Sequence, residues 1–137
     1  MLSNRARLAL FDIRDNIQLA EEFTAGLSFE VFADDQRTFY AVTRCLEIIS
    51  EAARRLPANI RNRHPELPWR AVMGAGNVYR HDYDNVAVEM VWRTVKGSLA
   101  ALRDAVEREI ARLDDDRESV QRRSESQRFV AAARWRA

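Results

Sequence analysis

The sequence predicts an all-α protein, an up-and-down bundle of three long helices and one short helix. Through three long segments, apolar residues recur every three or four positions, which is the spacing of one face of an α-helix. No segment shows the alternating pattern of a half-buried strand, and only 4 glycines and 3 prolines interrupt the chain. Helices of this kind bury their apolar faces against one another as a bundle.

Length and composition fit one domain with its own core. The chain has 137 residues, 47% hydrophobic and 31% charged, which is typical of a soluble, helix-rich protein. No apolar run approaches the roughly 18 residues that cross a bilayer, and no apolar signal-peptide segment follows the charged N-terminus. We therefore expect a cytoplasmic protein with no membrane partner. The net charge of +1 requires any RNA contact to come from a local basic patch.

The first two long helices are predicted over residues 4–23 and from Ser28 to about residue 56. Gly26 follows the first and suits a left-handed cap, while Pro57 ends the second. Ser28 begins this second element, and Asp34 and Asp35 mark either a break in it or a fresh start before Gln36. On that helix the single cysteine falls on the apolar face, where we expect it to act as a small buried hydrophobe.

The connection over residues 57–68 is basic and contains prolines. It holds His64, which precedes Pro65 and is expected to lie in solvent or to cap the preceding turn. A short helix is predicted over residues 68–79, and Gly74 within it lowers helix stability by roughly 1 kcal/mol relative to alanine. Such a cost indicates close approach of another backbone or room for a ligand.

The third long helix is predicted over residues 86–113, after which the chain changes character. Three consecutive aspartates at 114–116 are unfavourable at the C-terminal end of a helix dipole, so fraying is expected there. The chain therefore divides into a bundle domain, residues 1–113, and a charged C-terminal tail, residues 114–137. The tail is either disordered, the default for such a segment, or a helical extension that docks its aromatic side chains on a partner.

Chemically versatile side chains concentrate in residues 74–84. Asn77 and His81 share one face if this segment is helical, and Tyr83 lies near the helix end. An imidazole near neutrality can take a proton from a ribose 2′-hydroxyl or give one to a leaving oxygen, and a nearby amide or arginine can stabilise phosphate. No further His or Cys surrounds His81, so no metal is expected. The structural alternative is a histidine satisfied at a helix terminus, with Tyr83 packed beneath it.

Four segments of the chain share the ordered pattern of one protein family. They are SEAARRLP at 50–57, HPELPWR at 64–70, GAGNVYRHDY at 74–83 and VWRTVK at 91–96. In this order they resemble the HepT-like branch of the HEPN proteins, and the similarity covers about residues 8–113. An ordered set of this length is much more specific than a lone His-x-Tyr.

The resemblance implies a HEPN-like dimer of helical bundles, with the two central motifs facing each other across a cleft. It implies the toxin of a bacterial toxin–antitoxin pair, a metal-independent ribonuclease that acts on RNA through His81. The implied partner is a minimal nucleotidyltransferase antitoxin, which silences such toxins by transferring AMP to the motif tyrosine, here Tyr83. We expect Tyr83 to be exposed in the cleft, because a modifiable hydroxyl must be reachable. Exposed apolar positions such as Val78 and Met90 also favour a homodimer.

The family pattern places an arginine five residues before the histidine, and Gly76 occupies that position here. Asn77 and His81 match the pattern. The catalytic set is therefore His81 as acid and base, Asn77 as the orienting amide, and Arg80 or another arginine as the phosphate contact. The second interpretation is a catalytically degenerate HEPN dimer that acts as a binding module for a nucleotidyltransferase partner. A purely structural helical dimer is the third.

Overall fold

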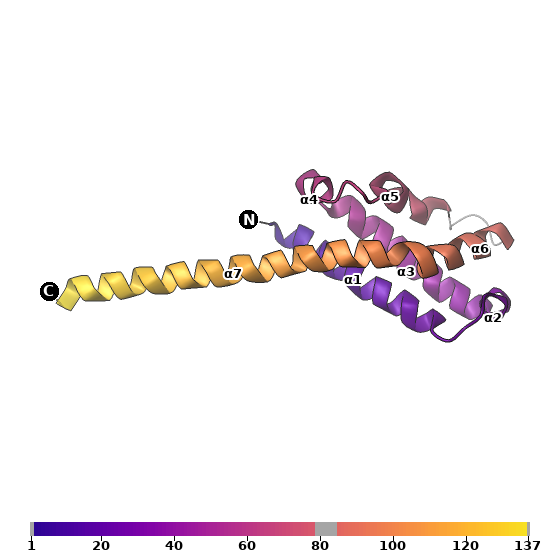
Figure 1. Cartoon of the computed structure of the whole chain (residues 1–137), viewed down its shortest axis with the longest axis horizontal. Coiled ribbons are helices and arrows are strands. Elements are labelled where there is room, and N and C mark those ends of the chain that lie inside the picture. Colours follow the sequence, from indigo (N-terminus) through magenta and orange to yellow (C-terminus); the bar gives the residue numbers. More distant parts are fainter. Residues whose placement is uncertain (1, 79–84, 137) are drawn as a thin grey trace.

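A computed structural model of the chain describes residues 2–78 and 85–136, and every element in these two ranges is helical, which confirms the all-α prediction. In chain order the elements are α1 (Asn4–Thr24), α2 (Phe29–Asp34), α3 (Gln36–Arg55), α4 (Ala58–Asn62), α5 (Trp69–Val78), α6 (Asn85–Arg93), the π-helical turn η1 (Thr94–Ser98) and α7 (Leu99–Arg136) (Figure 1).

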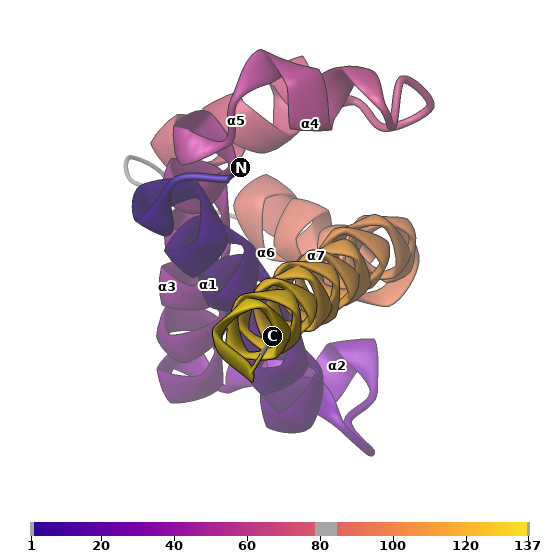
Figure 2. The same ribbon diagram turned by 90° about the vertical axis from the view of Figure 1, so that its left-hand side faces the viewer.

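The centre of the bundle is the pair α1 and α3, which pack against each other along most of their length. The first half of α7 packs on α1, and α5 packs on α3, so the two later helices lie on different sides of the central pair (Figure 2). The core between them is apolar and closed. Its fully buried side chains include Ile13 and Ile17 of α1, Val42 of α3, Val91 of α6 and Val106 of α7.

The helix boundaries follow local signals in the sequence. The side chains of Ser28 and Asp35 accept hydrogen bonds from backbone N–H groups three residues later, at the starts of α2 and α3. Gly26 follows α1 with a φ of 74°, the left-handed conformation that glycine adopts without strain. α3 ends at Arg55, and Leu56, the residue before Pro57, is extended, as predicted. Cys45 is buried on α3, also as predicted, and burial raises the pKa of its thiol.

The predicted third long helix is divided by a π-helical turn. A π turn contains an extra residue per turn, and here it carries Lys96 toward the end of α1. The Lys96 ammonium lies 3.3 Å from the carbonyl oxygen of Thr24 and 4.9 Å from the centre of the Trp92 ring. A cation at a helix C-terminus interacts favourably with the unpaired carbonyls there. The turn thus joins α6 and α7 to α1.

The tail is helical. α7 continues through residues 114–136 and projects away from the bundle (Figure 1). The expected fraying at residues 114–116 is wrong, because the helix continues to Arg136. The three aspartates therefore lie away from the negative end of its dipole. The last turn carries Arg134 and Arg136, which are favourable there. In the described part of the chain, no helix is both long enough and apolar enough to cross a membrane.

Candidate active site

The predicted motif begins on α5. Asn77 lies in the last turn of this helix, and α6 begins at Asn85. His81, Arg80 and Tyr83 fall in residues 79–84, outside the described residues, so their convergence, their roles and the exposure of Tyr83 stay predictions. The described residues do show how α5, which leads into the motif, is held in place.

Two side chains of α3 hold α5 by a single carbonyl. Ser50 Oγ donates to the Met73 carbonyl oxygen at 2.7 Å, and Arg54 Nη1 donates to the same oxygen at 2.8 Å. Ser50 is fully buried, so its bond is shielded from competing water. Met73 precedes Asn77 by one helical turn, and this anchoring therefore acts close to the motif.

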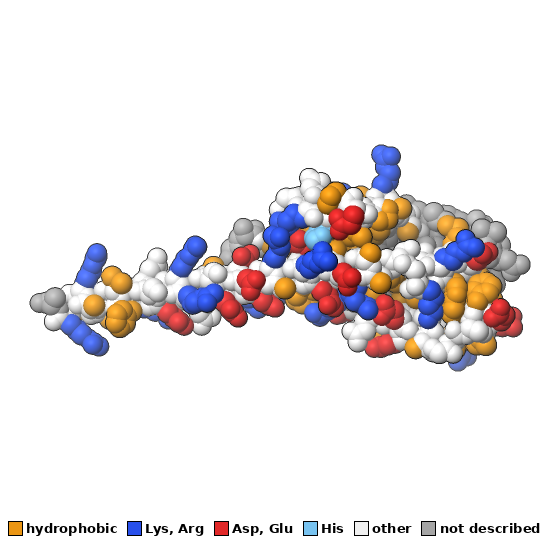
Figure 3. Space-filling view, in the orientation of Figure 1, with side chains coloured by type: hydrophobic (Ala, Val, Ile, Leu, Met, Phe, Trp, Pro, Cys, Tyr) orange, Lys and Arg blue, Asp and Glu red, His pale blue; other side chains and the backbone are white. Residues whose placement is uncertain are grey.

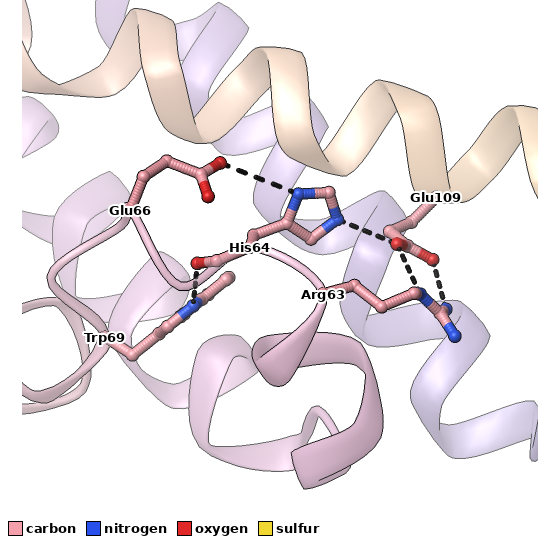
Figure 4. Close-up of polar contacts among 5 residues, drawn as sticks. All are labelled: Arg63, His64, Glu66, Trp69 and Glu109. Atoms are coloured by element: carbon pink, nitrogen blue, oxygen red, sulfur yellow. Dashed lines mark hydrogen bonds and ion pairs between the residues drawn. The ribbon is translucent and has the colours of Figure 1, made fainter.

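A buried ionic cluster holds the segment that precedes α5 (Figure 4). Glu109 of α7 is only 3% exposed. Arg63 donates to both of its carboxylate oxygens, from Nε at 2.9 Å and from Nη2 at 2.5 Å. His64 Nε2 lies 2.7 Å from Glu109 Oε1, and since an ionised carboxylate only accepts, Nε2 carries the hydrogen. The cluster ties the α4–α5 connection to α7.

The cluster also determines where α5 begins. Trp69, the first residue of α5, donates from its indole Nε1 to the carbonyl oxygen of His64 at 2.9 Å. The other imidazole nitrogen of His64 lies 3.8 Å from a carboxylate oxygen of Glu66 at the surface. One histidine therefore connects α7, through its side chain, with the start of α5, through its backbone.

The electrostatics of the cluster favour the ionised carboxylate. Burial by itself would raise the pKa of Glu109, but the hydrogen bonds from Arg63 and His64 outweigh it and hold this pKa below its ordinary value. The same hydrogen bond from Arg63 raises the pKa of the guanidinium. Glu109 is therefore charged and paired near neutral pH.

The placement of His64 in solvent is wrong, since its side chain is buried. Its partner lies 45 residues later in the chain, which local sequence patterns do not reveal. One signal was present, however. Glu109 interrupts the apolar face of α7 between Val106 and Leu113, and a carboxylate on a core-facing stripe requires a buried partner.

Two observations concern the space for a ligand beside α5 and the presence of a metal site. A Cβ built on Gly74 meets no heavy atom of the described residues within 4 Å, so close backbone packing among them does not explain this glycine. Among the described residues, no three His, Cys, Asp or Glu side chains gather as a metal site. The described frame therefore offers open space beside α5.

Comparison with known proteins decides the family. A family model described as ribonuclease HepT-like matches residues 13–109. The chain belongs to the HepT-like ribonuclease family. The match runs from α1 to Glu109 itself, so it includes the whole anchoring of α5 and leaves the last part of α7 outside.

Individual HepT-like relatives agree with this assignment. The probable ribonuclease HepT of Thermococcus cleftensis is 40% identical over 99 residues, 72% of this chain and 90% of that protein. A candidate RNase of Methanocaldococcus jannaschii is 31% identical over 106 residues, 77% of this chain and 91% of that protein. No solved structure matches the chain. Membership in this family supports a ribonuclease of the HEPN type.

The buried cluster generates a stability prediction. Glu109→Gln keeps the side-chain shape but removes the charge that Arg63 and His64 bind. We expect the free energy of unfolding at pH 7 to fall by about 1–3 kcal/mol, because two donors lose an anionic acceptor. Arg63 is 36% exposed, so water screens part of the loss. Urea unfolding measures the difference.

The pH dependence of this difference has a definite sign. The lowered pKa of Glu109 means that its stabilising charge is present above about 4.5, the ordinary value, and is lost as pH falls through the lower folded-state pKa. The difference in the free energy of unfolding between the parent and Glu109→Gln should therefore become smaller in acid. Glu107→Gln, an exposed neighbour on α7, serves as control and should change stability by less than about 0.5 kcal/mol. Equal effects at 107 and 109 would contradict the role assigned to the cluster.

Proposed function

We propose that this protein is a metal-independent endoribonuclease that cleaves RNA in the cleft of a homodimer, as the toxin of a toxin–antitoxin pair. The observation that carries the proposal is the HepT-like match over residues 13–109, which includes the whole motif. Asn77, at the end of α5, is the motif residue whose backbone the structure describes. The firm attachment of α5 to α3 supports the proposal, because catalytic groups work best on rigid elements.

The chemistry assigned to the motif needs no metal. His81 removes the proton from a ribose 2′-hydroxyl, and the resulting oxygen attacks the adjacent phosphorus. The bond between phosphorus and the 5′-oxygen breaks, and that oxygen takes a proton from a histidine in its acid form. Arg80 stabilises the charge that develops on the phosphoryl oxygens, and Asn77 orients the phosphate. The second copy in a dimer supplies another His81 to the same cleft.

The catalytic assignment predicts loss of cleavage in two variants. His81→Ala should lower kcat by about 100- to 10,000-fold, the usual contribution of general acid–base catalysis. Arg80→Ala should lower it by about 100- to 1,000-fold, as for loss of a charge-stabilising donor. Cleavage of cellular RNA is measured in EDTA, with Arg70→Ala as the control arginine, which should retain activity. Equal activity of His81→Ala and the parent would rule out this mechanism.

The replacement of the family arginine by Gly76 favours a second candidate, a degenerate HEPN dimer that binds a nucleotidyltransferase without cutting RNA. The two candidates differ in one assay. A folded parent that leaves RNA intact in EDTA, yet still forms a complex with a nucleotidyltransferase, supports the binding module.

Neutralisation by AMP transfer predicts a specific modification. Incubation with ATP, Mg²⁺ and a minimal nucleotidyltransferase should transfer AMP from ATP to the parent, with release of pyrophosphate, and abolish its cleavage of RNA. Tyr83→Phe lacks the acceptor hydroxyl and should remain unmodified and active. Intact-protein mass spectrometry detects each added AMP. Tyr40→Phe is the matched control and should be modified like the parent. If Tyr83→Phe is modified to the same extent as this control, the AMP acceptor is another residue.

A homodimer is expected from apolar side chains that one copy leaves in solvent. Val31 of α2 is 51% exposed, and Met90 of α6 is 43% exposed. Apolar side chains gather over this end of the bundle (Figure 3), close to the start of α6. Light scattering should give twice the mass of one chain, and Met90→Asp should shift the population toward monomer while Glu89→Gln leaves it unchanged. A parent that scatters only as a monomer contradicts the dimer.

A further inference from the structure

The projecting part of α7, residues 114–136, is a helical arm that lies outside the family match, which ends at residue 109. The 99 residues matched in the Thermococcus relative make up 90% of that protein but only 72% of this chain, so this chain is the longer. The arm is therefore a feature of this chain that membership in the family does not explain.

The two halves of the arm differ in charge. Residues 114–125 contain five acidic side chains and three arginines, whereas residues 126–136 contain three arginines and no acidic side chain. The outer half, residues 126–136, is therefore a local basic patch on a protein of net charge +1. A patch of this kind is what a nearly neutral protein needs in order to attract a polyanion.

Helix stability explains only part of the outer half. Arg134 and Arg136 are favourable near the C-terminal end of the helix dipole. The dipole does not explain Phe129 and Trp135, which are 78% and 90% exposed. Large aromatic side chains in solvent indicate a surface that meets a partner.

The helix places these side chains in two matched pairs. Arg128 and Trp135 are seven residues apart, as are Phe129 and Arg136, and residues at this separation lie on the same helix face about 10.5 Å apart. Each face therefore presents one guanidinium and one aromatic ring. Basic side chains stand off the arm with apolar side chains near its end (Figure 3). Within the described part of the chain, Arg128, Arg134 and Arg136 make no hydrogen bond or ion pair.

We propose that the outer half of the α7 arm binds single-stranded RNA, with Arg128, Arg134 and Arg136 on phosphates and Phe129 and Trp135 stacked on bases. Single-stranded RNA offers alternating phosphates and unstacked bases, which arginine and aromatic side chains recognise without sequence preference. This inference rests on the proposed function to the extent that RNA is also the substrate.

The position of the arm defines its contribution. In Figure 1 it projects from the end of the bundle opposite to the C-terminal end of α5. The whole of α7, 38 residues, is about 57 Å long at 1.5 Å per residue. Within one chain the arm therefore holds RNA at a distance from the C-terminal end of α5, and its loss should raise KM for long RNA while leaving kcat unchanged.

The test measures RNA binding by full-length protein in which His81→Ala prevents cleavage. Fluorescence anisotropy with a labelled single strand of about 20 nucleotides, long enough for more than one contact region, gives Kd between about 50 and 200 mM salt. Replacing Arg128, Arg134 and Arg136 with alanine should weaken binding at least tenfold at the lower salt. It should also make the salt slope shallower by about 2, since each single-strand phosphate contact contributes about 0.7.

The aromatic pair and a matched control separate stacking from charge. Phe129→Ala with Trp135→Ala should weaken binding about tenfold or more but leave the salt slope unchanged, because stacking releases no counterions. The control replaces Arg117, Arg122 and Arg123, an equal charge change on the same helix among acidic neighbours. It should alter Kd by less than about threefold, as expected for arginines already balanced by nearby acids. Apart from His81, which is replaced in every sample, all replaced side chains lie in the arm, and circular dichroism checks that its helix remains.

Three outcomes would overturn the inference. The first is an equal loss of RNA affinity when the three outer arginines and the three control arginines are replaced. The second is an unchanged Kd in both variants, and the third is no RNA binding by the parent. If the outer variants instead lower the dimer mass or the affinity for a nucleotidyltransferase while RNA binding is unchanged, the arm is a protein interface. The proposed function is judged separately by RNA cleavage in the parent, so a parent that does not cut RNA but loses RNA affinity in the outer variants leaves the inference standing.

Discussion

The arrangement of the molecule depends on how one carboxylate is buried. Glu109 stands on the core-facing side of α7, where an ionised group without partners would be strongly unfavourable. Arg63 and His64 both bind it, and this requirement draws the α4–α5 connection onto α7. Because Trp69 bonds to the backbone of His64, the beginning of α5 follows from the same requirement. A charge on one helix thus determines the position of another.

The second attachment of α5 is of a different kind. The Met73 carbonyl receives two donors from α3, one buried and one exposed. Together with the Glu109 cluster, it restrains α5 at its first residue and again near its middle. Functional groups on loops are usually positioned by such rigid elements. These two attachments therefore fix the position of α5, the helix that carries Asn77 and leads into the residues of the motif.

α7 consists of two parts that are stabilised in different ways. Up to Glu109 the helix is amphipathic, and its apolar face is buried against α1. Beyond Leu113 the apolar face is replaced by charge, so stability there comes from the helix itself and not from packing. A helix that leaves its bundle exposes all its faces, and this exposure is what makes the outer half suitable for a polyanionic partner.

Sequence patterns alone determined the helical class, the helix start at Ser28 and the stop at Pro57, because each depends on residues a few positions apart. Four ordered motifs also indicated the family. The patterns also placed Asn77 on a helix, whereas the roles of Arg80, His81 and Tyr83 are still predictions. Only the tertiary structure revealed that His64 is buried, that α6 and α7 meet through a π turn, and that α7 passes through three aspartates. The physical reason is that a partner 45 residues away, or a helix end far along the chain, changes the free energy of a residue without changing its local pattern.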